Sequence, residues 1–143
     1  MKRLNRVVFP TDFSESAHHA LAAALDLATA SGAELHLLHV VVLHRFDPVG
    51  VDDRLQQLQN DVHVRWEEMA AGRLRDAADR LGDLRTLTAQ RRAVSAADAI
   101  LEYGREQRAD VIVMGTHGRR GASHLLLGST AEEVVRHADC PVL

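Results

Sequence analysis

The sequence has one cysteine, few aromatic residues and no long hydrophobic run, and each shortage excludes a class of protein. Cys140 cannot form a disulfide within the chain, which fits a reducing compartment. Three phenylalanines, one tyrosine and one tryptophan offer little surface for stacking bases, and a net charge of −3 gives no basic face for nucleic acid. The apolar stretches are much shorter than the roughly 20 residues of a membrane-spanning helix. We therefore expect a cytoplasmic protein that binds neither nucleic acid nor membrane.

Nine histidines raise the question of a metal site. Their spacing nowhere combines a pair such as H-x-x-x-H with a nearby cysteine or carboxylate. We therefore expect the histidines to be scattered over the surface and loops, and we expect no metal site formed by protein side chains.

Alternating strand and helix patterns predict a single α/β domain over residues 1–143. Apolar runs predict strands at residues 6–9, 33–43, 84–94, 109–115 and 140–143, and helical spacing predicts helices at 14–32, 55–81, 95–107 and 129–138. Ser14 and Ser95 are predicted N-caps, and Gly32 is a predicted C-cap. Trp66 is predicted to anchor the core. The near-continuous apolar strands favour a parallel sheet covered by helices on both faces, with the polar strand 84–94 at an edge.

The segment "MGTHGRRGASHLLLGST", residues 114–130, gathers four glycines between a strand and a helix. In a doubly wound sheet, ligands bind beyond the carboxyl ends of strands where the strand order reverses, and "PTDFS" at residues 10–14 follows another buried strand. Gly128, Ser129 and Thr130 stand at a helix start, where free N–H groups and the helix dipole favour phosphate. An ordinary turn with a Thr130–Glu133 capping box accounts for Thr130, but it leaves the four glycines unexplained.

Common phosphate-binding signatures, including the Walker loop and G-x-G-x-x-G after the first strand, are absent. A different pattern, G-x2-G-x9-G-[ST], is met by Gly115, Gly118, Gly128 and Ser129. Together with "FPTDFSESAHHAL", "LLHVV", "ADVIVMGTHGRRG" and "LLLGSTAEEVVRHADCPVL", it makes the chain closely resemble the universal stress protein family over essentially its whole length.

This resemblance implies a Rossmann-like, adenine nucleotide alpha hydrolase-like fold, with a five-stranded, mostly parallel sheet in the order 3-2-1-4-5. It implies an adenine-nucleotide site in which Asp12 holds the ribose and main-chain groups of Val40 meet the adenine. The remaining implied residues line the pocket or hold the phosphates: Pro10, Thr11, Met114, Gly115, Gly118, Gly128, Ser129 and Thr130. The ligand is expected to be ATP with Mg²⁺, and the partners a second copy, bound through the last strand, and an unidentified protein.

Several alternatives stay open at this point. Asp12 has a second possible role as the N-cap of the first helix, and Arg119 is either a phosphate contact or a solvated loop residue. We expect a nucleotide-dependent sensor or regulator of the stress response. One alternative is a slow ATPase or self-phosphorylating enzyme, for which no base is clear and His117, Ser129 and Asp12 are candidates only by their proximity to the predicted phosphates. The other alternative is a nucleotide-free dimeric interaction protein or chaperone-like protein.

Overall fold

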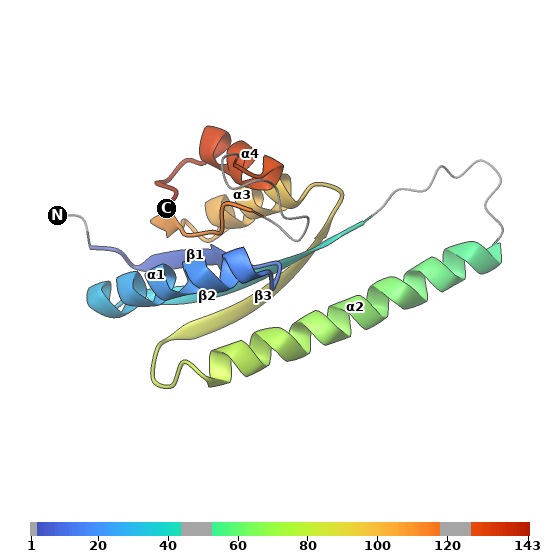
Figure 1. The fold of residues 1–143 in the computed structure, drawn as a ribbon, viewed down its shortest axis with the longest axis horizontal. Coiled ribbons are helices and arrows are strands. Elements are labelled where there is room, and N and C mark those ends of the chain that lie inside the picture. Colours follow the sequence, from blue (N-terminus) through green and yellow to red (C-terminus); the bar gives the residue numbers. More distant parts are fainter. Residues whose placement is uncertain (1–2, 44–52, 118–126) are drawn as a thin grey trace.

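The computed structural model describes residues 3–43, 53–117 and 127–143, and within them strands and helices alternate as the sequence predicts (Figure 1). The elements are β1 (Arg6–Pro10), α1 (Glu15–Ser31), β2 (Glu34–Val42), α2 (Asp53–Asp79), β3 (Thr86–Ala93), α3 (Ala96–Glu106), β4 (Val111–Ile112) and α4 (Ser129–His137). The expected α/β class is confirmed, because every strand pairs in parallel with its neighbour.

Over the described residues, the sheet has four strands in the order β3-β2-β1-β4, which is the expected order without its fifth member. The expected last strand is reduced to an isolated parallel bridge between Ile112 and Val142. It is held by Ile112 N–H donating to Pro141 O at 3.0 Å and Leu143 N–H donating to Ile112 O at 2.9 Å. β4 is likewise shorter than the expected strand at 109–115. The polar strand β3 lies at an edge of the sheet, as its alternating pattern predicts.

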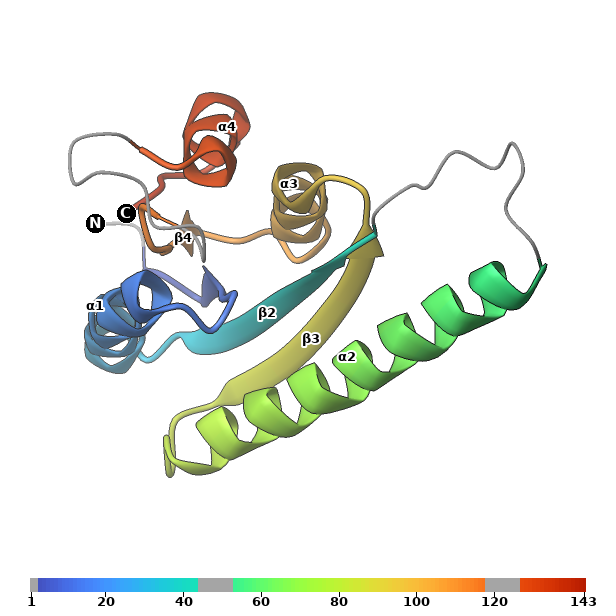
Figure 2. The same cartoon turned by 45° about the vertical axis from the view of Figure 1, so that its right-hand side comes forward.

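Helices cover both faces of the sheet (Figure 2). Side chains of β2 alternate between two apolar clusters, because successive residues of a strand point to opposite faces. Leu35 and Leu37 pack in the cluster that includes α1 and α2 residues, and Leu38 packs in the cluster that includes α3 and α4 residues. β1 contributes to both clusters and is paired on both edges, with β2 on one side and β4 on the other.

The helix ends agree with the predicted capping residues. Ser14 caps α1 by accepting a hydrogen bond from Ala17 N–H, and Ser95 caps α3 by accepting one from Asp98 N–H. Gly32 ends α1 in the left-handed conformation, with φ of 67°. A residue with a side chain is strained at that φ, so glycine is the residue that suits this helix end.

The predicted core position of Trp66 is wrong, since 48% of this residue is exposed. The buried residues of α2 are Ala70 and Leu74. Leu55 and Leu58, on the predicted apolar stripe, are also more than half exposed. The reason is length: 27 helical residues span about 40 Å, whereas the eight residues of β3 span about 26 Å. The N-terminal half of α2 therefore extends past the sheet (Figure 1).

Candidate functional site

A cavity of about 900 Å³ lies at the carboxyl ends of β1 and β2, beside the segment after β4 and the start of α4. It brings together most of the predicted site residues: Pro10, Thr11, Asp12, Val40, Met114, Gly115, Gly128, Ser129 and Thr130. Gly118 and Arg119, also predicted, lie outside the described residues. The cavity stands where the chain order reverses across the sheet, with β1 between β2 and β4.

The turn between β1 and α1 is built by local hydrogen bonds. Asp12 Oδ1 accepts from Ser14 N–H at 2.9 Å, and Thr11 Oγ1 accepts from Phe13 N–H at 3.0 Å. Since Ser14 caps α1, the alternative role of Asp12 as the N-cap does not apply. Asp12 also lines the cavity, and an ionised carboxylate can accept several hydrogen bonds.

The main chain of Val40 points toward the cavity for a reason set by the sheet. Leu38 O accepts from Thr11 N–H on the β1 side of β2, and the N–H groups of Leu35 and Leu43 donate to the β3 side. In a parallel ladder this alternation repeats every second residue, so Val40 turns its N–H and C=O toward β1 as Leu38 does. The β1–β2 pairing ends at Pro10 and Leu38. Val40 therefore presents a donor and an acceptor just past the end of β1.

Gly115 passes very close to the first turn of α1. A β-carbon there would lie 2.8 Å from Ser16 Oγ and 2.9 Å from the backbone nitrogen of Ala17. Such a contact forces atoms to move, so this glycine of the signature serves packing between β4 and α1. A second link follows, because Gly128 N–H donates to Thr116 O at 2.6 Å and so holds the start of α4 beside the segment after β4.

The N-cap of α4 is Gly128, which makes no side-chain capping hydrogen bond. The alternative interpretation, in which Thr130 caps this helix in a capping box with Glu133, therefore does not apply. The first N–H groups of a helix have no partner within the helix and attract anions. Ser129 and Thr130, which open α4, line the cavity. This end of the cavity is therefore chemically suited to a phosphate.

A model of the universal stress protein family matches residues 3–143. The chain belongs to the universal stress protein family. It is 31% identical to universal stress protein MJ0531 of Methanocaldococcus jannaschii, over 96% of this chain and 79% of that protein.

Two solved structures have the same fold as this universal stress protein. The structure of MJ0577, from the same organism, is 26% identical with a TM-score of 0.82, covering 99% of this chain and 95% of that one. A universal stress protein in complex with cAMP is 26% identical with a TM-score of 0.67, covering 99% and 96%.

One wall of the cavity in this family member is formed by residues that were not predicted from the sequence. Residues on the α1 and α2 face also line it: Phe13, His39, Trp66, Met69 and Arg73. His39 directly precedes Val40 in the quoted "LLHVV", and that adjacency was the available signal. Nothing in the sequence marked Trp66, Met69 and Arg73 of α2 as cavity residues, because their position depends on where the long helix crosses β2.

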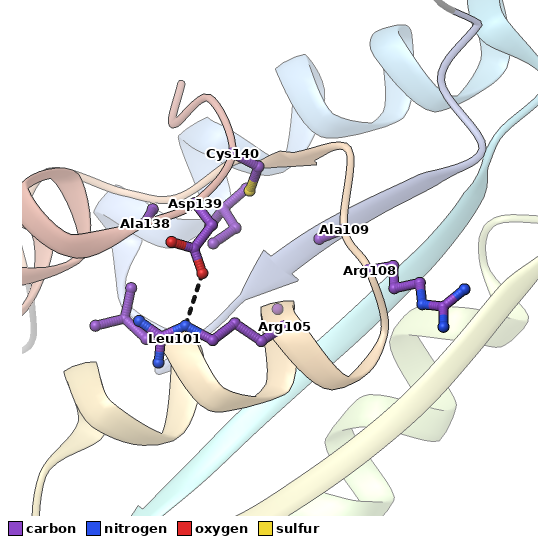
Figure 3. Close-up of a pocket in the computed structure, with 9 residues that line it drawn as sticks. Leu101, Arg105, Arg108, Ala109, Ala138, Asp139 and Cys140 are labelled. Carbon is purple, nitrogen blue, oxygen red and sulfur yellow. Dashed lines mark hydrogen bonds and ion pairs between the residues drawn. The ribbon is translucent and has the colours of Figure 1, made fainter.

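A second, smaller cavity of about 290 Å³ lies between α3 and the segment after α4 (Figure 3). Arg105 Nε donates to Asp139 Oδ2 at 2.7 Å beside it. Cys140 also lines this cavity, and burial raises the pKa of its thiol, with further increases from Asp139 and Asp110. A raised pKa keeps the thiol protonated near neutral pH, so Cys140 is poorly suited to act as a nucleophile. Of the predicted site residues that the structure describes, none lines this cavity.

Within the described ranges, no group of three histidine, cysteine or acidic side chains is arranged to hold a metal ion. Over the same residues, no helix has both the length and the apolar character that crossing a bilayer requires.

Proposed function

We propose that the cavity binds an adenine nucleotide, namely ATP with Mg²⁺, and that its occupancy regulates a protein partner during the stress response. The main support for this proposal is that one cavity has chemically different groups at its two ends. Val40 offers a main-chain donor and acceptor suited to a base edge, and the uncapped start of α4 offers N–H groups suited to phosphate. Asp12 belongs to the same cavity and is suited to ribose hydroxyls.

The relative in complex with cAMP supports an adenine nucleotide as the ligand class. Mg²⁺ would come with the phosphates, because this ion is usually held by phosphate oxygens, waters and one or two carboxylates rather than by a protein cage. The ion would neutralise phosphate charge next to the start of α4.

We further propose a cytoplasmic homodimer that contacts its copy through the segment after α4. The Ile112–Val142 bridge adds that segment to the sheet beyond β4. A sheet edge of this kind offers backbone groups for pairing with a second chain. Sedimentation of the purified protein tests the dimer, and a monomer at all concentrations contradicts it.

The first test measures nucleotide carried by the freshly purified protein. Denaturation followed by anion-exchange chromatography is expected to release ATP at close to one molecule per chain. Calorimetry with Mg-ATP then measures the affinity of the emptied protein. Mostly ADP would favour the slow ATPase instead, and the absence of both carried nucleotide and calorimetric binding would contradict the proposal.

A charge variant tests the phosphate end of the cavity. Gly128→Glu places a carboxylate at the start of α4, where its charge repels phosphate, and is expected to weaken Mg-ATP binding by about 100-fold. Gly128→Gln has nearly the same size without the charge and is the matched control. Gly128 has φ of −62°, so both side chains are compatible with its backbone. Equal affinities of the two variants would show that phosphate does not bind there.

A further inference from the structure

Three side chains from three elements form a stack beside the cavity. The guanidinium carbon of Arg73 on α2 lies 5.2 Å from the ring centroid of Phe13, in the turn after β1. The Phe13 ring in turn lies 4.8 Å from the ring of His39 on β2, with 35° between the planes. All three residues line the cavity. The stack therefore connects α2 and β2 to the turn that carries Asp12.

His39 also bonds to this turn directly. Its Nδ1 lies 2.8 Å from the carbonyl oxygen of Thr11. Because a carbonyl oxygen can only accept a hydrogen bond, Nδ1 carries the ring proton and donates a hydrogen bond to the Thr11 carbonyl oxygen. His39 is only 9% exposed, so solvent competes weakly with this hydrogen bond.

The held turn has a strained backbone. Phe13 has φ of 61°, in the left-handed region that residues with bulky side chains avoid. Such a conformation is energetically unfavourable and persists only where the surroundings enforce it. The surroundings here are the stack on the Phe13 ring and the hydrogen bond from His39 to Thr11.

We propose that His39 is a positioning residue, which holds the turn after β1 so that the Asp12 carboxylate faces the ribose hydroxyls of the nucleotide. This inference rests on the proposed function. His39 acts through Thr11 and the Phe13 ring, which flank Asp12 in the chain. Losing it therefore weakens recognition of the ribose hydroxyls and leaves the base and phosphate contacts in place.

The test compares two ligands and three variants. Mg-ATP and Mg-2′,3′-dideoxy-ATP differ only in the ribose hydroxyls, and calorimetry gives the affinity of each. His39→Phe retains an aromatic ring for the stack and removes the donor, whereas His39→Asn retains a donor near the position of Nδ1. His18→Phe, on the exposed face of α1, is the control for replacing a histidine with phenylalanine.

The wild-type protein is expected to prefer Mg-ATP to the dideoxy compound. His39→Phe should bind Mg-ATP about three- to tenfold more weakly, which corresponds to one neutral hydrogen bond, with little change for the dideoxy compound. His39→Asn should recover most of the loss, and His18→Phe should match the wild type. Thermal melting of each variant verifies that it is folded.

The outcomes separate two failures. If the wild type binds neither nucleotide, the proposed function is wrong and the role of His39 is wrong with it. If the wild type prefers Mg-ATP but His39→Phe keeps the same preference, the nucleotide site stands and the positioning role is overturned. An equal loss for both ligands also overturns it, because that pattern indicates a purely structural histidine.

Discussion

At Gly115 the backbone following β4 leaves no room for a β-carbon against α1. The atoms in the way are Ser16 Oγ and backbone atoms of Ser16 and Ala17, and backbone cannot move without shifting the helix. The first glycine of the signature pattern is thus required by the contact between two elements. The fold therefore requires glycine at position 115 whether or not a ligand is bound, although the same contact also shapes the cavity.

Gly115→Ala is expected to lower the free energy of unfolding by about 1–3 kcal/mol, because the added methyl overpacks this contact. Denaturant titration measures the change. Gly72→Ala in α2 is the matched control, since a β-carbon there meets nothing within 4 Å and alanine favours a helix over glycine by about 1 kcal/mol. The explanation fails if Gly115→Ala is as stable as the control.

Single residues differ in how far the sequence determines their roles. The caps at Ser14, Gly32 and Ser95 were predictable, because capping depends on neighbours within a few positions of the chain. The contact of His39 with the Thr11 carbonyl was not, because it joins residues 28 positions apart whose pairing depends on sheet register. The roles proposed for Asp12 and other site residues toward a ligand stay predictions.

At the scale of an element, α2 has two unlike halves. Its C-terminal half packs on the sheet through Leu74, whereas Leu58 in its N-terminal half is 61% exposed. Between them, Glu67 accepts a hydrogen bond from Arg92 Nη2 of β3 at 2.6 Å, and this bond lowers the pKa of the Glu67 carboxyl. The Arg92 side chain is about half exposed, so solvent screens the pair and it contributes little to stability.

The two halves predict opposite results from one substitution. Leu74→Ala is expected to lower the free energy of unfolding by about 2–5 kcal/mol, because it leaves a cavity in the core. Leu58→Ala should change it by less than about 0.5 kcal/mol, because the side chain is mostly solvated. Urea titrations of both variants measure this. Comparable losses would mean that the N-terminal half is packed in solution.

Element order was predictable from the alternation of patterns, whereas the length of β4 and the extent of the buried face of α2 were not. The apolar run at 109–115 predicted a long strand, but β4 covers only Val111–Ile112 where β1 pairs with it. The helical stripe on α2 predicted a continuous buried face. Periodicity identifies which residues share a face, but it does not show where the sheet beneath that face ends.

At the scale of the whole molecule, the cavity is assembled from segments spread along the chain, from the turn after β1 to the start of α4. Each described segment is placed by the sheet, and none of them contains both the groups proposed to face a base and the groups proposed to face a phosphate. A ligand that binds this cavity therefore binds the native state in preference to the unfolded chain.

Mg-ATP is accordingly expected to raise the melting temperature. At a ligand concentration 100 times Kd the native state gains about 2.7 kcal/mol, which corresponds to roughly 5–15 °C. Scanning calorimetry across a series of ligand concentrations measures the rise. The Gly128→Glu variant should show little increase over the same series, and an unchanged wild-type melting temperature at saturating ligand would contradict the proposed site.

The central place of β1 also matters while the protein is being made. β1 pairs with β2, which follows it closely, and with Val111–Ile112, which leaves the ribosome roughly 100 residues later. At a synthesis rate of about 5–20 residues per second, the edge of β1 that pairs with β4 stays unpaired for roughly 5–20 seconds. An unpaired strand edge is a template for pairing with other chains. Nascent chains should therefore be most prone to aggregate in this interval, and slower translation would extend it.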